Sequence, residues 1–255
     1  MTTLVGAEIR KLTTTRSTWW LLGGLAALCA ALAGAMLTAG YVLDYAGATP
    51  GVVDGARLVY RQPGATAYVI PLVVGTLLVT REYHTRTIVP TLLTEPRRGA
   101  VYAAKVLGGA AASAVCAAAA VVVTVAVAAS VFAANGDAAF LTDGAVLATL
   151  AGTFGALALW GLIGVGLGAL LRNQAAALTL VLVATLLLEP VLGIVLNTAD
   201  MPEASAYLPG GAANLMSGGA GFAGDGSALT GFAVLAAYTV AALAVGAVRF
   251  LRYEP

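Results

Sequence analysis

Charge is scarce in this chain of 255 residues. Asp, Glu, Lys and Arg make up 10% of it and hydrophobic residues 60%, whereas soluble domains carry about 25% charged residues. Such a chain cannot hide its apolar side chains in one water-soluble core, so the composition predicts an all-α polytopic membrane protein. The net charge is only +1, and this argues against a nucleic-acid partner, because phosphate binding needs clustered basic residues.

Several residue types that carry chemistry are almost missing. His84 is the single histidine, which excludes His-rich metal sites and Ser-His-Asp triads and favours a solvated loop residue. Neither lysine, Lys11 or Lys105, follows the GxxxxG of a phosphate-binding loop. Cys29 and Cys116 lie in apolar runs and are interpreted as packing residues rather than a disulfide. We expect no catalytic residue, no metal and no cofactor, with any ATP bound by a partner subunit.

Long uncharged runs divide the chain. A bilayer's hydrocarbon core takes roughly 20 helical residues, and six runs reach about that length. The sequence predicts one transmembrane domain over residues 1–255, with spans at about 19–42, 64–80, 106–134, 144–171, 175–197 and 229–248.

The N-terminal segment before the first span is polar but patterned. Val5, Ile9 and Leu12 share one helical face, which predicts an amphipathic helix over 3–16 lying in the membrane interface. The alternative is a frayed polar tail. The helix is favoured because Trp19-Trp20 follows, where aromatic belts sit.

The distribution of basic residues predicts the orientation. With both termini in the cytoplasm, inside segments carry 11 of the 13 Lys and Arg, and outside segments carry only Arg57 and Arg61. The reversed topology would break the positive-inside rule. We therefore expect a multi-pass protein of the cell membrane with both termini cytoplasmic.

Three local features add detail to the predicted spans: a proline, a short outside helix and a pair of glycines. Pro71 should kink the second span, because proline removes a backbone donor and clashes with the preceding turn. A short helix is expected in the outside loop before it, at 52–60. Gly164 and Gly168 form a GxxxG spacing, which is weak evidence for a helix contact in a chain with 31 glycines.

The cytoplasmic loop over 81–105 is the most polar part of the chain. The stretch from Thr80 to Lys105 holds seven of the 25 charged residues. Within it Ile88, Leu92 and Leu93 fall on one helical face. Glu95-Pro96 should end this helix, because the residue before proline is pushed out of the helical region. We expect a short cytoplasmic helix between spans two and three.

This loop resembles the first cytoplasmic loop of ABC exporter permeases of the type-2 class. The matching positions are Glu82, Thr87-Ile88, Pro96-Arg97 and Lys105; Pro90 inside the helix and Arg86 before the Thr depart from the pattern. The resemblance implies a coupling helix that contacts a separate ABC ATP-binding subunit, and a second permease copy or homologue forming a dimer. The residues implied in coupling are Glu82, Thr87, Ile88, Leu92, Leu93 and Arg97.

Glu189 is the single acidic residue inside a predicted span. It lies about 21 Å along a helix starting at Ala175, where an ionisable group normally faces the bundle interior or a wet cavity. Pro190 beside it should break the helix. Two interpretations stay open: Glu189 and Pro190 line a substrate route or hinge the apolar segment 206–219, or Glu189 caps a short span at the interface.

Together these features predict a permease subunit of an ABC exporter, in contact with membrane lipids, that couples ATP hydrolysis by a separate subunit to efflux of an amphipathic or lipid-like substrate. The alternative is a non-transporting membrane scaffold or an intramembrane enzyme that uses Glu189 as its acid. The helical cytoplasmic loop separates the two, since a transporter needs it for coupling and a scaffold does not.

Overall fold

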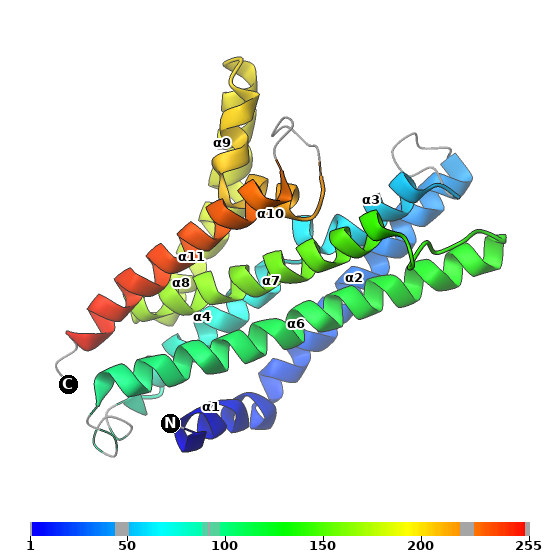
Figure 1. Ribbon diagram of the computed structural model, residues 1–255. Helices are drawn as coiled ribbons and strands as arrows, with labels where there is room; N and C mark the ends of the chain where they lie inside the picture. The colour runs from blue at the N-terminus through cyan, green and yellow to red at the C-terminus, as the bar shows by residue number, and fades with distance from the viewer. Residues whose placement is uncertain are drawn as a thin grey trace.

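The protein is a bundle of helices (Figure 1). The computed structural model describes residues 2–43, 51–88, 90, 93, 95, 97–219 and 227–252, and within those ranges it contains no strand. The prediction of an all-α protein is confirmed. The helices are α1 (Thr2–Thr14), α2 (Arg16–Leu43), α3 (Val53–Thr66), α4 (Val69–His84), α6 (Arg98–Asn135), α7 (Gly144–Leu171), α8 (Gln174–Val183), η1 (Ala184–Leu188), α9 (Glu189–Thr198), η2 (Pro202–Tyr207), α10 (Pro209–Met216) and α11 (Ala228–Leu251).

Six helical stretches of the described chain are long and apolar enough to cross a membrane, as predicted. Helices α4 and α7 form the centre of the bundle, and α2, α6, α8 and α11 pack around them. Both termini lie at the same end (Figure 1). The stretches are Arg16–Val42, Val53–His84, Arg98–Asn135, Gly144–Leu171, Gln174–Thr198 and Ala228–Leu251.

The second stretch is interrupted rather than kinked. Helix α3 ends at Thr66 and α4 begins at Val69. The interruption lies at Ala67, four residues before Pro71, because Pro71 has no N–H to donate to the Ala67 carbonyl. The amide of Ile70 donates to that carbonyl instead, at 3.1 Å. The short outside helix predicted at 52–60 is longer than expected and leads directly into the span.

Helices α4 and α7 approach each other at glycines. A Cβ added at Gly164 would overlap the Leu72 carbonyl, and one at Gly168 would lie 2.7 Å from the Thr76 carbonyl. Only glycine permits this separation of the two backbones. The GxxxG spacing, weak evidence in the sequence, therefore marks the central contact of the bundle.

The expectation that Pro190 breaks its helix is wrong. Helical backbone angles continue through Leu188 and Glu189, and a π-helical turn over Ala184–Leu188 precedes the proline. In that turn the Glu189 amide bonds to the carbonyl of Ala184, five residues back. The wider turn accommodates the proline ring without ending the helix.

After α9 the chain returns into the bundle. Helix α10 packs against α7 and α11, and its Ala212, Ala213 and Leu215 are buried. Gly152 of α7 and Gly231 of α11 leave room for it, because a Cβ at either position would overlap an α10 carbonyl. The apolar segment 206–219 is thus an integral part of the packed structure.

Candidate functional site

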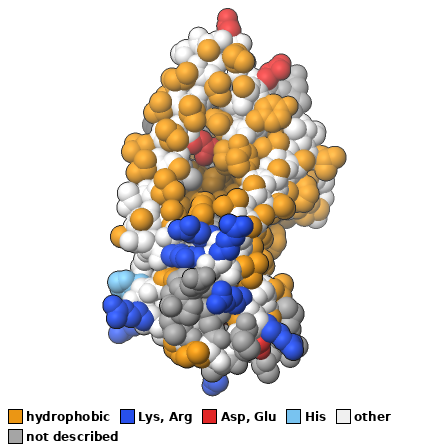
Figure 2. Space-filling view, turned by 90° about the vertical axis from the view of Figure 1, so that its left-hand side faces the viewer, with side chains coloured by type: hydrophobic (Ala, Val, Ile, Leu, Met, Phe, Trp, Pro, Cys, Tyr) orange, Lys and Arg blue, Asp and Glu red, His pale blue; other side chains and the backbone are white. Residues whose placement is uncertain are grey.

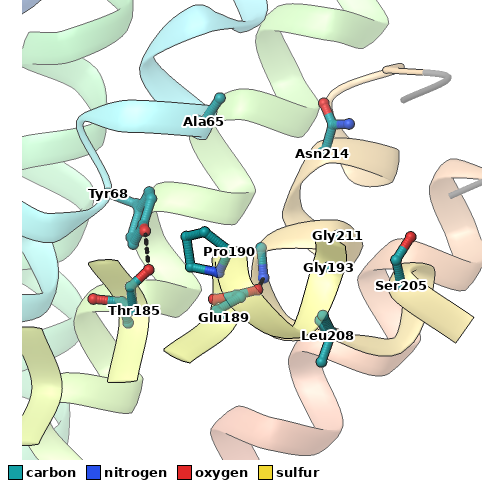
Figure 3. Close-up of a pocket in the computed structure, with 12 residues that line it drawn as sticks. Ala65, Tyr68, Thr185, Glu189, Pro190, Gly193, Ser205, Leu208, Gly211 and Asn214 are labelled. Carbon is teal, nitrogen blue, oxygen red and sulfur yellow. Dashed lines mark hydrogen bonds between the residues drawn. The ribbon is translucent and has the colours of Figure 1, made fainter. Parts of the chain in front are cut away.

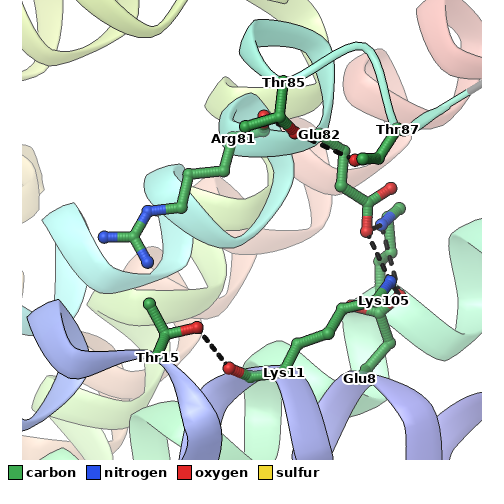
Figure 4. A network of polar contacts seen from close by, with 8 residues as sticks. All are labelled: Glu8, Lys11, Thr15, Arg81, Glu82, Thr85, Thr87 and Lys105. Carbon is green, nitrogen blue, oxygen red and sulfur yellow. Dashed lines mark hydrogen bonds and ion pairs between the residues drawn. The ribbon is translucent and has the colours of Figure 1, made fainter.

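Four charged side chains meet at the end of the bundle that holds the termini (Figure 4). Lys105 of α6 lies 2.6 Å from Glu82 of α4 and 3.3 Å from Glu8 of α1, measured from Nζ to Oε1. Lys11 of α1 donates to the same two oxygens, at 2.7 Å and 2.9 Å. Three helices that are far apart in sequence are therefore joined by one network.

The network is largely shielded from solvent. Lys105 is fully buried, Glu8 and Glu82 are each 5% exposed, and the Lys11 side chain is 48% exposed. Burial lowers the pKa of Lys11, but its hydrogen bonds to Glu82 and Glu8 outweigh this, and the pKa is raised above its ordinary value. Each ammonium has two carboxylate partners, so the charges compensate one another at low dielectric.

Local sequence explains how these side chains meet. Helix α4 continues to His84, which places Glu82 in its last turn, and α6 begins at Arg98, which places Lys105 two turns inside it. Gly108, one turn further along α6, lets α1 approach, since a Cβ there would lie 2.8 Å from the Cβ of Glu8. Glu8 and Lys11 are three residues apart on α1 and face the same way.

The turn that follows Glu82 is a Schellman motif. The Thr87 amide donates to the Glu82 carbonyl at 2.9 Å, and the Arg86 amide to the Tyr83 carbonyl at 3.3 Å. Arg86 has a left-handed φ of 56°, a conformation that favours glycine. A small residue adopts this conformation more easily, so Arg86 departs from the pattern at a strained position. The motif fixes where the chain leaves α4.

The predicted coupling residues fall on different surfaces. Ile88 is buried between α4, α6, α7 and α11, whereas Leu93 is 79% exposed and Arg97 is exposed at the start of α6. Thr87 is exposed beside Glu82. The predicted cytoplasmic helix is described as helical at residues 88, 90 and 93. Leu92, Thr94 and Pro96 lie outside the described residues.

Sequence reasoning missed Glu8 and Lys11 as partners of the loop. It placed the N-terminal helix in the membrane interface without a partner in the loop, but Lys11 points to Glu82 and Glu8. The signal available was an acid and a base three residues apart, on a helix with an apolar face. Of that face, Leu12 packs against the buried cluster around Ile88; the side chains of Val5 and Ile9 lie outside the described residues.

Basic side chains gather around the same end. Figure 2 shows Lys and Arg side chains on the lower half of one face, with hydrophobic side chains above them. Arg172 and Arg249 are linked by a hydrogen bond from the Arg172 guanidinium to the Arg249 carbonyl, and Arg98 donates to the Leu251 carbonyl at 3.1 Å. The basic side chains of the described residues therefore concentrate at the end of the bundle that holds the termini.

A second site lies around Glu189 (Figure 3). Its carboxylate accepts hydrogen bonds from the backbone amides of Gly210 and Gly211 in the first turn of α10. It lines a cavity of about 310 Å³ together with Pro190 and Tyr68. Tyr68 is the other titratable side chain in the lining, so the described residues around the cavity offer no second carboxylate for acid-base chemistry.

Comparison with known proteins identifies the chain's relatives at the level of the family. The family described as ABC-2 family transporter protein matches residues 6–254. A comparison with curated proteins finds no match. The family match extends over nearly the entire chain, including all six candidate spans and both sites described above. This chain therefore belongs to the ABC-2 transporter family and is a multi-pass membrane protein.

Proposed function

We propose that this protein is the membrane-spanning permease subunit of an ABC exporter, and that a separate ATP-binding subunit drives it through the segment between α4 and α6. The observation that carries the proposal is the buried network of Glu8, Lys11, Glu82 and Lys105. It joins the N-terminal helix to both helices that bracket this segment.

The network suits the transmission of a movement. A partner that pushes on the segment 85–97 acts on the end of α4 and the start of α6. Buried ion pairs resist separation, because parting them leaves uncompensated charges at low dielectric. Helices α1, α4 and α6 should therefore move as one body, and α4 carries the motion along its glycine contact with α7.

The segment between α4 and α6 has an inner and an outer face. Ile88 is 2% exposed and anchors the segment to the bundle, while Leu93 is 79% exposed. An exposed leucine next to an anchored residue offers a partner protein an apolar side chain to bury. The ATP-binding subunit would contact the Leu93 face, with Thr87 and Arg97 at its edges.

The dimeric state and the direction of transport belong to the same proposal. The stretch Gln174–Thr198 is the least buried of the six candidate spans, and several of its large side chains are exposed, among them Leu187 and Ile194. We propose that a second permease copy covers this stretch and α2, with lipid around the remainder.

The direction of transport follows from the distribution of charge. The basic end of the bundle faces the cytoplasm under the positive-inside rule, and the complex exports amphipathic or lipid-like molecules along a route past Glu189.

The test uses one matched pair of variants. The tagged chain is purified from native membranes, and the ATP-binding subunit that accompanies it is identified by mass spectrometry. Leu93→Asp should release this subunit or abolish its stimulated ATP hydrolysis. Leu141→Asp places the same change on a leucine in the turn between α6 and α7 and should have no effect. If Leu93→Asp retains the subunit and normal stimulation, the assigned contact is wrong.

A further inference from the structure

The cavity at Glu189 lies where the helical pattern of the chain is interrupted. The break between α3 and α4 contributes Tyr68, the π-helical turn contributes Thr185, and the returning segment contributes Leu208 and Gly210 (Figure 3). Irregular backbone at membrane depth is tolerated where it is buried in protein or lines a cavity. Interrupted helices also form the binding sites of many transporters.

The charge of Glu189 has no cationic partner in the described residues. All ion pairs found there involve Lys11, Lys105 or Arg57. The amides of Gly210 and Gly211 hold and orient the carboxylate, but neutral donors do not cancel its charge. A carboxylate held in this way inside a span favours a cation in the cavity.

The remainder of the lining selects the kind of cation. Pro190, Leu208 and the ring of Tyr68 provide apolar and aromatic surface. The Tyr68 ring is fixed by stacking on Trp160, with centroids 4.7 Å apart, and by its hydroxyl, which donates to the Thr185 carbonyl at 3.2 Å. Aromatic rings attract organic ammonium groups.

A divalent metal fits this lining poorly. Calcium takes about six to eight oxygen ligands, often with more than one carboxylate among them, and magnesium requires near-ideal octahedral coordination. Glu189 is the one carboxylate in the lining, and the described residues hold no cluster of three metal-ligating side chains. A single negative charge beside apolar walls matches a monovalent cation with an apolar body.

We propose that this cavity binds a monovalent organic cation, with its ammonium group on the Glu189 carboxylate and its apolar part against Tyr68, Pro190 and Leu208. The cavity volume of about 310 Å³ is at the lower end of ligand-binding pockets. The inference rests on the proposed function only where it identifies the bound cation as the transported substrate. The binding itself does not depend on an ATP-binding subunit.

The test measures binding to the purified full-length chain by isothermal titration calorimetry. The probe is benzyltrimethylammonium, and phenylmethanesulfonate, which has a similar body and the opposite charge, is the control ligand. The wild-type protein should bind the cation and not the anion. Glu189→Gln should weaken cation binding at least about tenfold, as expected for a lost charge-assisted contact. Glu203→Gln, which neutralises an exposed acid of η2, should bind as the wild type does.

A second variant addresses the cavity without touching the acid. Gly193 lines the cavity, and a Cβ added there meets no atom within 4 Å. Gly193→Leu should therefore fold, fill the cavity and abolish cation binding while Glu189 stays in place. Helical circular dichroism and a single gel-filtration peak check the fold of each variant.

Two results would overturn the inference. One is equal cation binding by the wild type, Glu189→Gln and Gly193→Leu, which would place the probe elsewhere. The other is no binding by the wild type at millimolar probe, which would leave Glu189 as a cap for α10. Either result leaves the Leu93 test of the permease untouched. Conversely, selective cation binding with a normal Leu93→Asp complex would support the site and contradict the proposed coupling.

Discussion

The protein buries charge in two regions, and it does so in opposite ways. At the terminal end of the bundle, two carboxylates and two ammonium groups from α1, α4 and α6 form a compensated network. At the cavity, a single carboxylate, Glu189, is held by two backbone amides. A compensated network fixes the positions of helices, whereas an uncompensated charge is available to a ligand.

This contrast predicts which property each region controls. Removing one member of the network leaves its partners buried without compensation, so the cost should appear as lost stability. Removing the charge of Glu189 removes a buried charge that has no cationic partner, so stability should change little. The loss should appear in the affinity for a ligand. Coupling would depend on the first region and substrate choice on the second.

The largest effect on stability is expected from Lys105→Met. The methionine fills similar space, but Glu8 and Glu82 are left with one half-exposed lysine, and breaking a buried pair in this way costs about 3–5 kcal/mol. Thermal unfolding of the purified protein in mild detergent should show a large drop in Tm. Lys11→Met is the matched control and should cost less, because 48% of the Lys11 side chain is exposed. Equal losses would mean that burial does not set the energy of the network.

The second effect concerns the link between the two regions. Helix α4 carries Glu82 at one end, begins beside Tyr68 of the cavity at the other, and packs on α7 through Gly164. Gly164→Val would press a side chain into the Leu72 carbonyl, and overpacking of this kind costs typically 1–3 kcal/mol. We expect a lower Tm together with loss of coupling between ATP hydrolysis and transport.

A glycine with free space around it is the control for this prediction. Gly144 at the start of α7 meets no atom within 4 Å of an added Cβ, so Gly144→Val should leave Tm nearly unchanged. A Gly164→Val protein with wild-type stability would show that α4 and α7 need not approach at this point.

The sequence predicted the outline of the fold because hydropathy determines it. Runs long enough to span a bilayer identified all six stretches. The continuity of the helix at Pro190 was not predictable, since the π-helical turn that absorbs the proline has no sequence signature. The GxxxG spacing of Gly164 and Gly168 was visible, but its partner on α4 emerges only in three dimensions.

In each of the two sites the sequence identified one acidic residue but not the groups that surround it. Glu82 stood out because it lies in a polar loop with a recognisable pattern, and Glu189 because it is an acid in an apolar run. The lysines that compensate Glu82 are 71 residues before it and 23 after it, and no local pattern joins them to it. The amides that hold Glu189 are backbone groups, which no sequence motif marks.

A smaller and opposite effect is expected from Arg86→Gly. Arg86 has φ of 56° in the turn that ends α4 beside Glu82, and this conformation costs a non-glycine residue about 1–2 kcal/mol. Glycine removes that strain but loses about 0.5–1 kcal/mol of chain entropy, so a net gain of up to about 1.5 kcal/mol is expected. Arg97→Gly, at φ of −79°, has no strain to relieve and should destabilise slightly. A lower Tm for Arg86→Gly would assign the arginine a stabilising contact of its own.

The smallest effect on stability, and the sharpest comparison, comes from making one chemical change at both regions. In Glu82→Gln the amide removes a charge on which Lys11 and Lys105 depend, so Tm should fall clearly. In Glu189→Gln the side-chain oxygen can still accept from Gly210. The lost strength of a charge-assisted bond and the relief of an uncompensated buried charge then oppose each other, so the stability should change by less than about 1 kcal/mol. Tm values of both variants, measured side by side in the same detergent, decide the matter. If Glu189→Gln loses as much stability as Glu82→Gln, the negative charge of Glu189 stabilises the folded protein and is not available to bind a ligand.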